Sequence, residues 1–141
     1  MTPDVALAKL ASSETCLRRI RAVTRNDPAR LEDIDVQDIV VLNLQRAIQS
    51  AIDLAAHLLA TGHLGLPQSL KEHFTLLVSG GIIEPALGHR LEAMAGFRNI
   101  AVHDYQAIKP EILKHIVADR LTDLEELMNV VRRRISANTG C

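Results

Sequence analysis

The sequence predicts an all-α protein, an antiparallel bundle of four long helices and one short helix in a single domain over residues 1–141. The first observation is that 48% of the 141 residues are hydrophobic, while the only aromatic residues are Phe74, Phe97 and Tyr105. A core made of Leu, Ile, Val and Ala favours packed helices over a β-sandwich. The second is that apolar residues recur at helical spacing, whereas no useful stretch alternates with a period of two. The third is chain length, since two domains of half this size would each lack a sufficient core.

Prolines and capping residues set the expected ends of the first two helices. Pro3 follows Thr2 and suits the first turn of a helix that continues to about Asn26. After a polar loop, Asp35 is the expected N-cap of a second helix, which ends at Gly62. Apolar residues line this second helix at helical spacing: Val41, Leu44, Ile48, Ile52, Ala55 and Leu59.

The remaining helices follow from the same kinds of signal. A capping box from Ser69 to Glu72 opens a short helix that ends at the glycine pair 80–81. Pro85 begins the fourth helix and Pro110 begins the fifth. One long apolar stripe predicts that the fifth helix is continuous: Leu113, Val117, Leu124, Met128, Val131 and Ile135. We expect a frayed or disordered tail after this helix, at about 137–141.

Charge and cysteine content exclude several classes of protein. Sixteen Lys and Arg against seventeen Asp and Glu give a net charge of −1, which excludes nucleic-acid binding by bulk positive charge but leaves room for a small basic site. Two cysteines, Cys16 and Cys141, are too few for a disulfide scaffold. Without a signal peptide or an apolar run of about 20 residues, we expect a cytoplasmic protein that does not enter the membrane.

The six histidines do not predict a metal site. No two of them are four residues apart, no HExxH sequence occurs, and neither cysteine has a cysteine close to it in the chain. Asp53 and His57 are one helical turn apart, but such a pair is more often a surface hydrogen bond than a metal site.

In the fourth helix a charged residue interrupts the apolar face. Arg98 falls in the middle of a stripe formed by Leu87, Leu91, Met94, Ala95, Phe97 and Ala101. Tyr105 follows seven residues later on the same face of an ideal helix. Since a buried, unpaired guanidinium is costly, Arg98 needs a carboxylate, a phosphate or a cleft that admits water.

Asn99 and His103 lie beside this arginine, one helical turn apart, so that the amide can orient the imidazole. Two ordinary explanations compete with a catalytic site. Arg98 and His103 are explained equally well as an ion pair and a satisfied polar residue, or as part of a symmetric subunit contact. The last explanation is compatible with catalysis, because a dimer seam can itself be the active site.

The segment Arg98-Asn99-Ile100-Ala101-Val102-His103-Asp104-Tyr105 resembles the signature of HEPN-domain ribonucleases, in which Arg and a polar residue precede His. The extended form, with Tyr two residues after His, resembles the HepT-like toxins, which pair with small MNT-type nucleotidyltransferase antitoxins. The resemblance extends to the whole chain, an all-helical domain of this size with the motif late in the penultimate long helix.

This resemblance implies a metal-independent endoribonuclease toxin of a type II or type VII-like toxin–antitoxin pair, with no cofactor. It implies a homodimer in which two copies of the motif face each other across a two-fold seam. By the same resemblance, Arg98 and His103 are catalytic, Asn99 supports them, and Tyr105 is the residue that the antitoxin adenylylates.

The chemistry of these residue types agrees with such roles. RNA supplies its own nucleophile, the 2′-OH, so cleavage needs proton transfer and stabilisation of charge on phosphorus. The imidazole of His103 exchanges protons near neutral pH, and Arg98 offers fixed donors to phosphate oxygens. We therefore expect a 2′,3′-cyclic phosphate product and activity that survives EDTA. An AMP group on Tyr105 would put an anion beside Arg98 and compete with RNA.

A second basic cluster lies at the end of the first helix: Arg18, Arg19, Arg21 and Arg25. Cations are favoured at helix C-termini and are usually solvated, which explains the cluster without a function. If the long helices alternate in direction, however, this cluster flanks the end of the fourth helix and forms an RNA backbone track.

Two other functions remain open. The chain can be a non-catalytic HEPN-like helical subunit that binds a nucleotide or substrate for a partner nucleotidyltransferase, although such a subunit would not need His103. It can also be a structural dimerisation bundle, which leaves the polar residues of the fourth helix unexplained. Phe74 fits a core position better than a base-stacking position.

Overall fold

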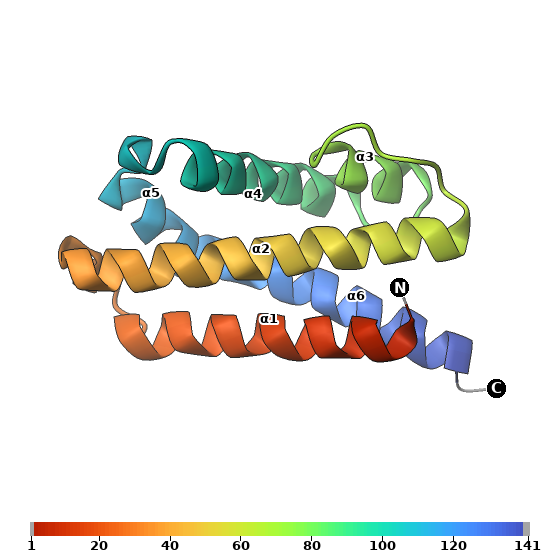
Figure 1. Ribbon diagram of the computed structural model, residues 1–141, viewed down its shortest axis with the longest axis horizontal. Helices are drawn as coiled ribbons and strands as arrows, with labels where there is room; N and C mark the ends of the chain where they lie inside the picture. Colours follow the sequence, from red (N-terminus) through yellow and green to blue (C-terminus); the bar gives the residue numbers. More distant parts are fainter. Residues whose placement is uncertain (1, 140–141) are drawn as a thin grey trace.

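The computed structural model describes residues 2–139, with side chains described for residues 2–137 (Figure 1). All secondary structure in these residues is helical, and they contain no strand, which confirms the all-α prediction. The α-helices are α1 (Pro3–Thr24), α2 (Ile34–Gly62), α3 (Glu72–Ser79), α4 (Pro85–His103), α5 (Pro110–His115) and α6 (Leu121–Thr139). Three short turns join them: the 3-10 turns η1 (Pro28–Glu32) and η2 (Tyr105–Ala107), and the π-helical turn η3 (Ile116–Arg120).

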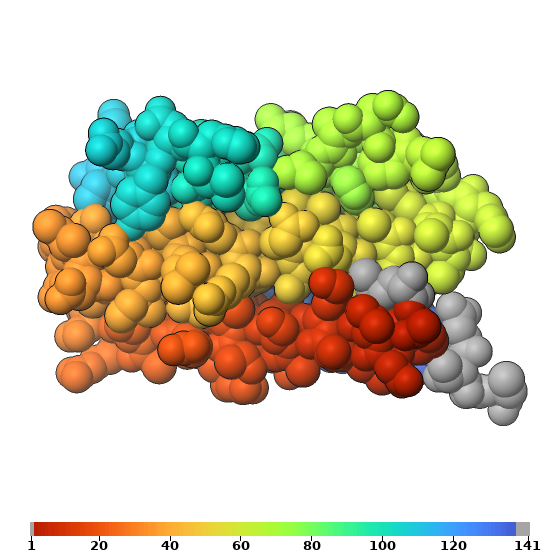
Figure 2. Space-filling view, in the orientation of Figure 1, coloured from red at the N-terminus to blue at the C-terminus, as the bar shows by residue number. Residues whose placement is uncertain are grey.

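Helix α2 is the centre of the bundle. It packs along α1 and also contacts α3, α4, α5 and α6. In Figure 1, α1 and α4 run in the same direction and α2 runs against both, so the C-terminal ends of α1 and α4 lie at the same end of the molecule. This is the alternating topology that the sequence predicts, but α2 lies between the two ends. Between α1 and α4 the surface of α2 stays uncovered (Figure 2).

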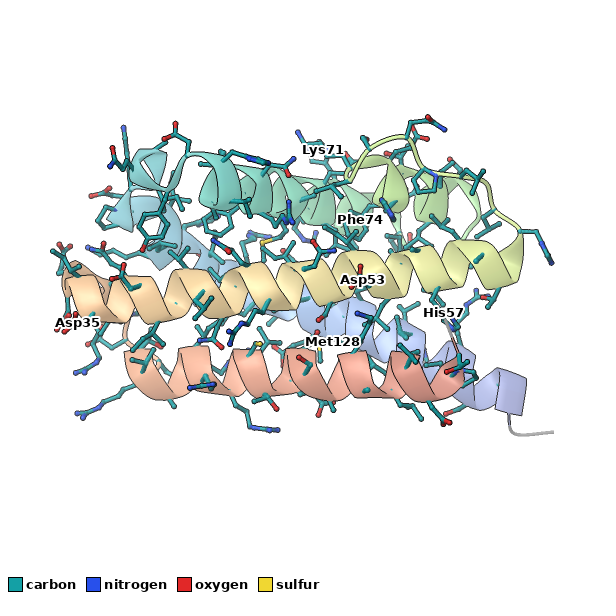
Figure 3. The ribbon with its side chains drawn as sticks, in the orientation of Figure 1. Asp35, Asp53, His57, Lys71, Phe74 and Met128 are labelled. Atoms are coloured by element: carbon teal, nitrogen blue, oxygen red, sulfur yellow. The ribbon has the colours of Figure 1, made fainter. Side chains whose placement is uncertain are left out.

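The N-cap of α2 is Asp33, and the prediction of Asp35 is wrong. The carboxylate of Asp33 accepts hydrogen bonds from the backbone N–H groups of Asp35 (2.8 Å) and Val36 (3.4 Å). Asp33 thereby satisfies two of the free donors at the helix start, so α2 begins two residues earlier than expected. Asp35 lies in the first turn at this end of the bundle, where a negative charge is favoured (Figure 3).

The other helix ends lie within a few residues of the predicted ones. Helix α1 stops at Thr24 because Arg25 and Asn26 adopt left-handed backbone angles, with φ of 53° and 55°. The capping box before α3 forms in part. The Ser69 hydroxyl accepts from the Glu72 N–H (3.1 Å), whereas the Glu72 carboxylate reaches back to the N–H of Gln68.

The segment after Pro110 is not one uniform helix. Helix α5 passes through the π-helical turn η3 into α6. Ile116 and Leu121 are both buried although they are five residues apart, a spacing that suits a π-turn and not an α-helix. The π-turn thus keeps both residues in the core while Arg120 stays partly exposed. Helix α6 continues to Thr139, into the range in which we expect a frayed tail, and residues 140 and 141 lie outside the described residues.

The core is built almost entirely from aliphatic side chains. Phe74 is 1% exposed and packs between α3 and α2, which confirms its assignment to the core (Figure 3). Helices α3 and α4 approach closely at Gly88, where an added Cβ would lie 2.3 Å from Cγ2 of Val78. Cys16 is buried in the core, and Cys141 lies outside the described residues. Among the helices described, none combines the length and apolar character needed to span a bilayer.

Candidate active site

Helix α4 positions the motif. Pro85 occupies the first turn of α4. The inward face of α4 is buried against α2, α3 and α6. The residues of this face are Leu87, Gly88, Leu91, Met94, Ala95, Phe97 and Ala101. Near its C-terminal end α4 is held against α2, because the Gln45 side chain donates to the carbonyl oxygen of Ala101 (3.2 Å). This bond satisfies one of the carbonyl groups that a helix end leaves free.

Arg98 lies half-buried on this helix. Its Nη1 is 3.4 Å from the amide oxygen of Asn99, a long hydrogen bond, and no carboxylate pairs with it among the described residues. The sequence predicts that this guanidinium needs a carboxylate, a phosphate or a cleft that admits water. The described part of the structure excludes the first of these, a carboxylate of the same chain. Most of the guanidinium donors stay available to an anion that approaches from solvent.

His103 is the last residue of α4 and is exposed. In the described part of the chain its ring makes neither a hydrogen bond nor an ion pair. The Asn99 amide oxygen contacts Arg98 and not His103, so the expected orientation of the imidazole by Asn99 is not seen. Both ring nitrogens of His103 are free to exchange protons with a ligand.

An ideal helix would place Tyr105 on the same face of α4 as Arg98. The structure does not, because α4 ends at His103. Asp104 leaves helical geometry with φ of −150° and ψ of 65°, and Tyr105 begins the turn η2. Its hydroxyl donates a hydrogen bond to the carboxylate of Asp38 on α2. Partial burial and, after it, this bond raise the pKa of Tyr105 to about 12.

Asp38 and Gln45 are the residues of this region that the sequence does not reveal. They lie seven residues apart on one face of α2, and they hold the turn η2 and the end of α4, respectively. Two polar residues at this spacing on an exposed helix face are common, so only their contacts with α4 and η2 distinguish them.

The arginine cluster of α1 lies apart from the motif. It occupies the same end of the bundle as the end of α4, but α2 separates the two (Figure 1). Arg21 pairs with Glu125 on α6, at 2.6 Å, and Arg18 donates to Thr15 within α1. Arg25 forms the left-handed C-cap of the helix. Arg18, Arg19, Arg21 and Arg25 therefore do not flank Arg98 within one chain.

An apolar groove of about 300 Å³ lies beside the motif, between α4 and the α5–η3 segment. Met94, Phe97, Ile112 and Ile116 contribute apolar surface to its walls. Basic side chains stand around it: His89, Arg90, His115 and Arg120. Phe97, which directly precedes Arg98 in the chain, is the lining residue nearest to the motif in sequence.

No group of three or more His, Cys, Asp or Glu side chains in the described part of the chain is arranged to hold a metal ion. The groups that the structure offers for chemistry at this end of α4 are thus the guanidinium of Arg98, the imidazole of His103 and the phenol of Tyr105. They can bind an anion, exchange a proton and receive a modification, respectively.

Comparison with known proteins places the chain in a family. The model of the family described as "Ribonuclease HepT-like" matches residues 13–131. The mRNA nuclease HepT of Shewanella oneidensis is 39% identical over 129 residues, which are 92% of this chain and 97% of that protein.

Solved structures agree with this assignment. A toxin–antitoxin structure with AMP-PNP superposes with a TM-score of 0.86 at 38% identity, over 92% of this chain and 98% of the other. The tri-AMPylated Shewanella oneidensis HEPN toxin in complex with MNT antitoxin gives 0.86 at 39% identity, over 94% and 99%. A cytosolic protein of Bacillus subtilis, YutE, shares the fold alone, at 14% identity and a TM-score of 0.84, over 98% and 93%. Fold, motif and sequence identity agree, and the chain belongs to the HepT-like ribonuclease family.

Proposed function

We propose that this chain is an endoribonuclease toxin in which Arg98 and His103 cleave RNA and Asn99 supports them. The observation that carries the proposal is that Arg98 lies half-buried without a carboxylate partner in the described structure, on the same helix end as an exposed and unbonded His103. A structural arginine would normally be paired. Membership in a ribonuclease family, and a relative named as an mRNA nuclease, support the same reaction.

In this mechanism His103 removes the proton of a ribose 2′-OH, whose oxygen attacks the adjacent phosphorus. The bond from phosphorus to the 5′-oxygen breaks, and that oxygen takes a proton as it leaves. Arg98 binds the phosphate oxygens, on which negative charge increases in the transition state. The products are a 2′,3′-cyclic phosphate and a 5′-hydroxyl, and neither step requires a metal ion or a cofactor.

We further propose that the active unit is a homodimer, in which a second His103 supplies the acid. The outer face of α4 carries a stripe of residues without a charged side chain. They follow one another at steps of four, three, four and three residues: His89, Ala93, Gly96, Ile100 and His103. Solvent-facing helix surfaces are normally charged. We call this set the α4 outer stripe. Ile100 is 46% exposed, and the apolar groove beside Ala93 continues the surface.

The proposed partner is an MNT-type nucleotidyltransferase antitoxin that adenylylates Tyr105. Support comes from the relatives, since solved structures of similar toxins hold an MNT antitoxin and one of these toxins is tri-AMPylated. Tyr105 directly follows the helix end that carries Arg98 and His103 and is 45% exposed, so an AMP group there would hinder access of RNA. We propose that the toxin acts in the cytoplasm. Arg18, Arg19, Arg21 and Arg25 remain proposed contacts to the RNA backbone.

The test is cleavage of RNA by the purified chain, with and without EDTA. We expect wild-type activity to survive EDTA, and Arg98→Ala and His103→Ala each to lower it by about 100-fold or more. His73→Ala is the control, because the His73 ring lies on α3 and hydrogen-bonds to the backbone carbonyl groups of Ser69 and Leu70, just before that helix.

Dependence on a metal ion, or a product with a 3′-hydroxyl, would contradict the mechanism. Full activity in both variants, together with nucleotide binding by the chain, would favour the alternative of a non-catalytic subunit for a partner nucleotidyltransferase.

A further inference from the structure

The hydrogen bond between Tyr105 and Asp38 links two segments that are far apart in sequence. Tyr105 lies in the turn η2 and Asp38 in the second turn of α2. The phenol donates its proton to the carboxylate. Both residues are exposed, so another protein can reach the hydroxyl while the carboxylate is in place.

The position of the tyrosine is fixed from two sides. Gln45, two turns after Asp38 on the same face of α2, holds the Ala101 carbonyl at the end of α4. The turn η2 is closed by its own backbone bonds, from the Ala107 N–H to the Asp104 carbonyl (3.0 Å) and from the Ile108 N–H to the Tyr105 carbonyl (3.1 Å). The Tyr105 hydroxyl is therefore held against Asp38 before any partner binds.

Partial burial and the contact with Asp38 keep the hydroxyl protonated. His103 and Asp104 precede Tyr105 in the chain, but of the described charged groups it is Asp38 that bonds to the phenol. Burial and this bond raise the pKa of Tyr105 to about 12, so the phenolate is scarce at neutral pH. A reaction at this oxygen then needs a base that takes the proton as the new bond forms.

We propose that Asp38 is that base, so that the toxin supplies the proton acceptor for the adenylylation of its own Tyr105. The inference rests on the proposed function, because it assumes that Tyr105 is the modified residue. The Tyr105 oxygen attacks the α-phosphorus of ATP bound to the nucleotidyltransferase. The bond from that phosphorus to the bridging oxygen breaks, pyrophosphate leaves with the electron pair, and the proton passes to the Asp38 carboxylate and then to water.

The chemistry parallels that of protein kinases, where an aspartate accepts the proton of the substrate hydroxyl during phosphoryl transfer. Here the aspartate belongs to the substrate protein. Once esterified, the tyrosine has no proton to donate, and a phosphodiester anion replaces the donor next to the carboxylate. The product therefore loses the Asp38 contact, which favours release of the modified side chain from α2.

The experiment measures initial rates of AMP transfer from ATP labelled at the α-phosphate, with Mg²⁺ and the nucleotidyltransferase antitoxin of the same operon, between pH 6 and pH 9. The substrates are the full chain and its Asp38→Asn variant, which keeps the shape of the side chain but accepts protons poorly. Asp35→Asn is the matched control, since Asp35 is an exposed aspartate on the same helix that does not contact Tyr105. Thermal unfolding establishes that both variants fold.

We expect Asp38→Asn to lower the rate at pH 7 by about 100-fold and Asp35→Asn to leave it unchanged. The ratio of the wild-type rate to the Asp38→Asn rate should fall as the pH rises, because the variant must react through the phenolate. A purely structural role of Asp38 would give a ratio that does not depend on pH.

Besides a ratio that does not depend on pH, two results would overturn the inference. If transfer proceeds through phenolate formed beforehand, Asp38→Asn reacts at least as fast as wild type at pH 7, because loss of the carboxylate lowers the pKa of Tyr105. This result contradicts the role of Asp38 but not the modification of Tyr105. If the wild-type chain takes up no label at Tyr105, as judged by mass spectrometry, both the proposed modification and the role of Asp38 are wrong.

Discussion

Three polar side chains lie at the end of α4, and they differ in the hydrogen bonds that they make within the chain. The guanidinium of Arg98 bonds only to the neighbouring Asn99 amide, and His103 makes no bond within the described structure. Tyr105, in contrast, is tied to Asp38. Two groups are therefore available to a ligand, while the third already has a carboxylate partner within the chain. This division supports separate roles in RNA cleavage and in its control.

The role of Tyr105 can be isolated by removing one oxygen atom. Tyr105→Phe keeps the ring but cannot be adenylylated, so we expect full toxicity that the antitoxin no longer neutralises enzymatically. The measurement is bacterial growth with the toxin variant alone and with the antitoxin co-expressed. Wild-type toxin with a nucleotidyltransferase-inactive antitoxin is the control, and it should resemble the variant. If the antitoxin controls Tyr105→Phe as well as wild type, Tyr105 is not the switch.

At the scale of helices and turns, residue pattern predicts the presence of elements better than their junctions. Pro85 and Pro110 correctly mark two helix starts, because proline suits the first turn whatever surrounds it. Asp33 and Asp35 are equally good caps by residue type, so residue type alone does not choose between them. The spacing of Ile116 and Leu121 contains the signal for the π-turn, but it is visible only once both are known to be buried.

The site follows the same pattern. Arg98, Asn99 and His103 can be found on α4 because a polar group interrupts an apolar face of one helix. Asp38 accepts a hydrogen bond from Tyr105 across 67 residues of sequence, and no spacing rule connects them. The end of α4 at His103 also depends on tertiary contact, since Gln45 of α2 bonds to the Ala101 carbonyl there. Long-range partners of this kind are what sequence reasoning leaves out.

The close approach of α3 and α4 gives a prediction for these elements. A Cβ at position 88 would lie 2.3 Å from Cγ2 of Val78, a short branched side chain with little freedom to move. We expect Gly88→Ala to lower the free energy of unfolding by about 1–3 kcal/mol, although alanine is the better helix former. Urea denaturation measures the change.

The control is the pair Val78→Ala and Val78→Ala/Gly88→Ala. Removing the two Val78 methyl groups removes the contact, so the second substitution should cost less in that background than in wild type. Equal costs in the two backgrounds would mean that the approach of α3 to α4 does not limit residue 88.

For the whole molecule, the central position of α2 determines which surfaces can act together. It lies between the arginines of α1 and the motif on α4. The surface next to His103 is instead the uncharged α4 outer stripe, with Lys71 beside Gly96 as its charged neighbour (Figure 3). A second copy packed on this stripe would bring two His103 side chains to one seam, as the proposed two-histidine chemistry requires.

Introducing charge on the stripe tests this assembly. A buried carboxylate without a partner costs several kcal/mol, so Ala93→Glu and Ile100→Glu should each convert a dimer into monomers. Light scattering after size-exclusion chromatography measures the mass, and RNA cleavage should be lost together with the dimer.

Leu66→Glu is the control, because Leu66 is 84% exposed in the connection between α2 and α3, away from α4. A wild-type monomer with full activity, or dimers that persist in both variants, would show that the α4 outer stripe is not the seam.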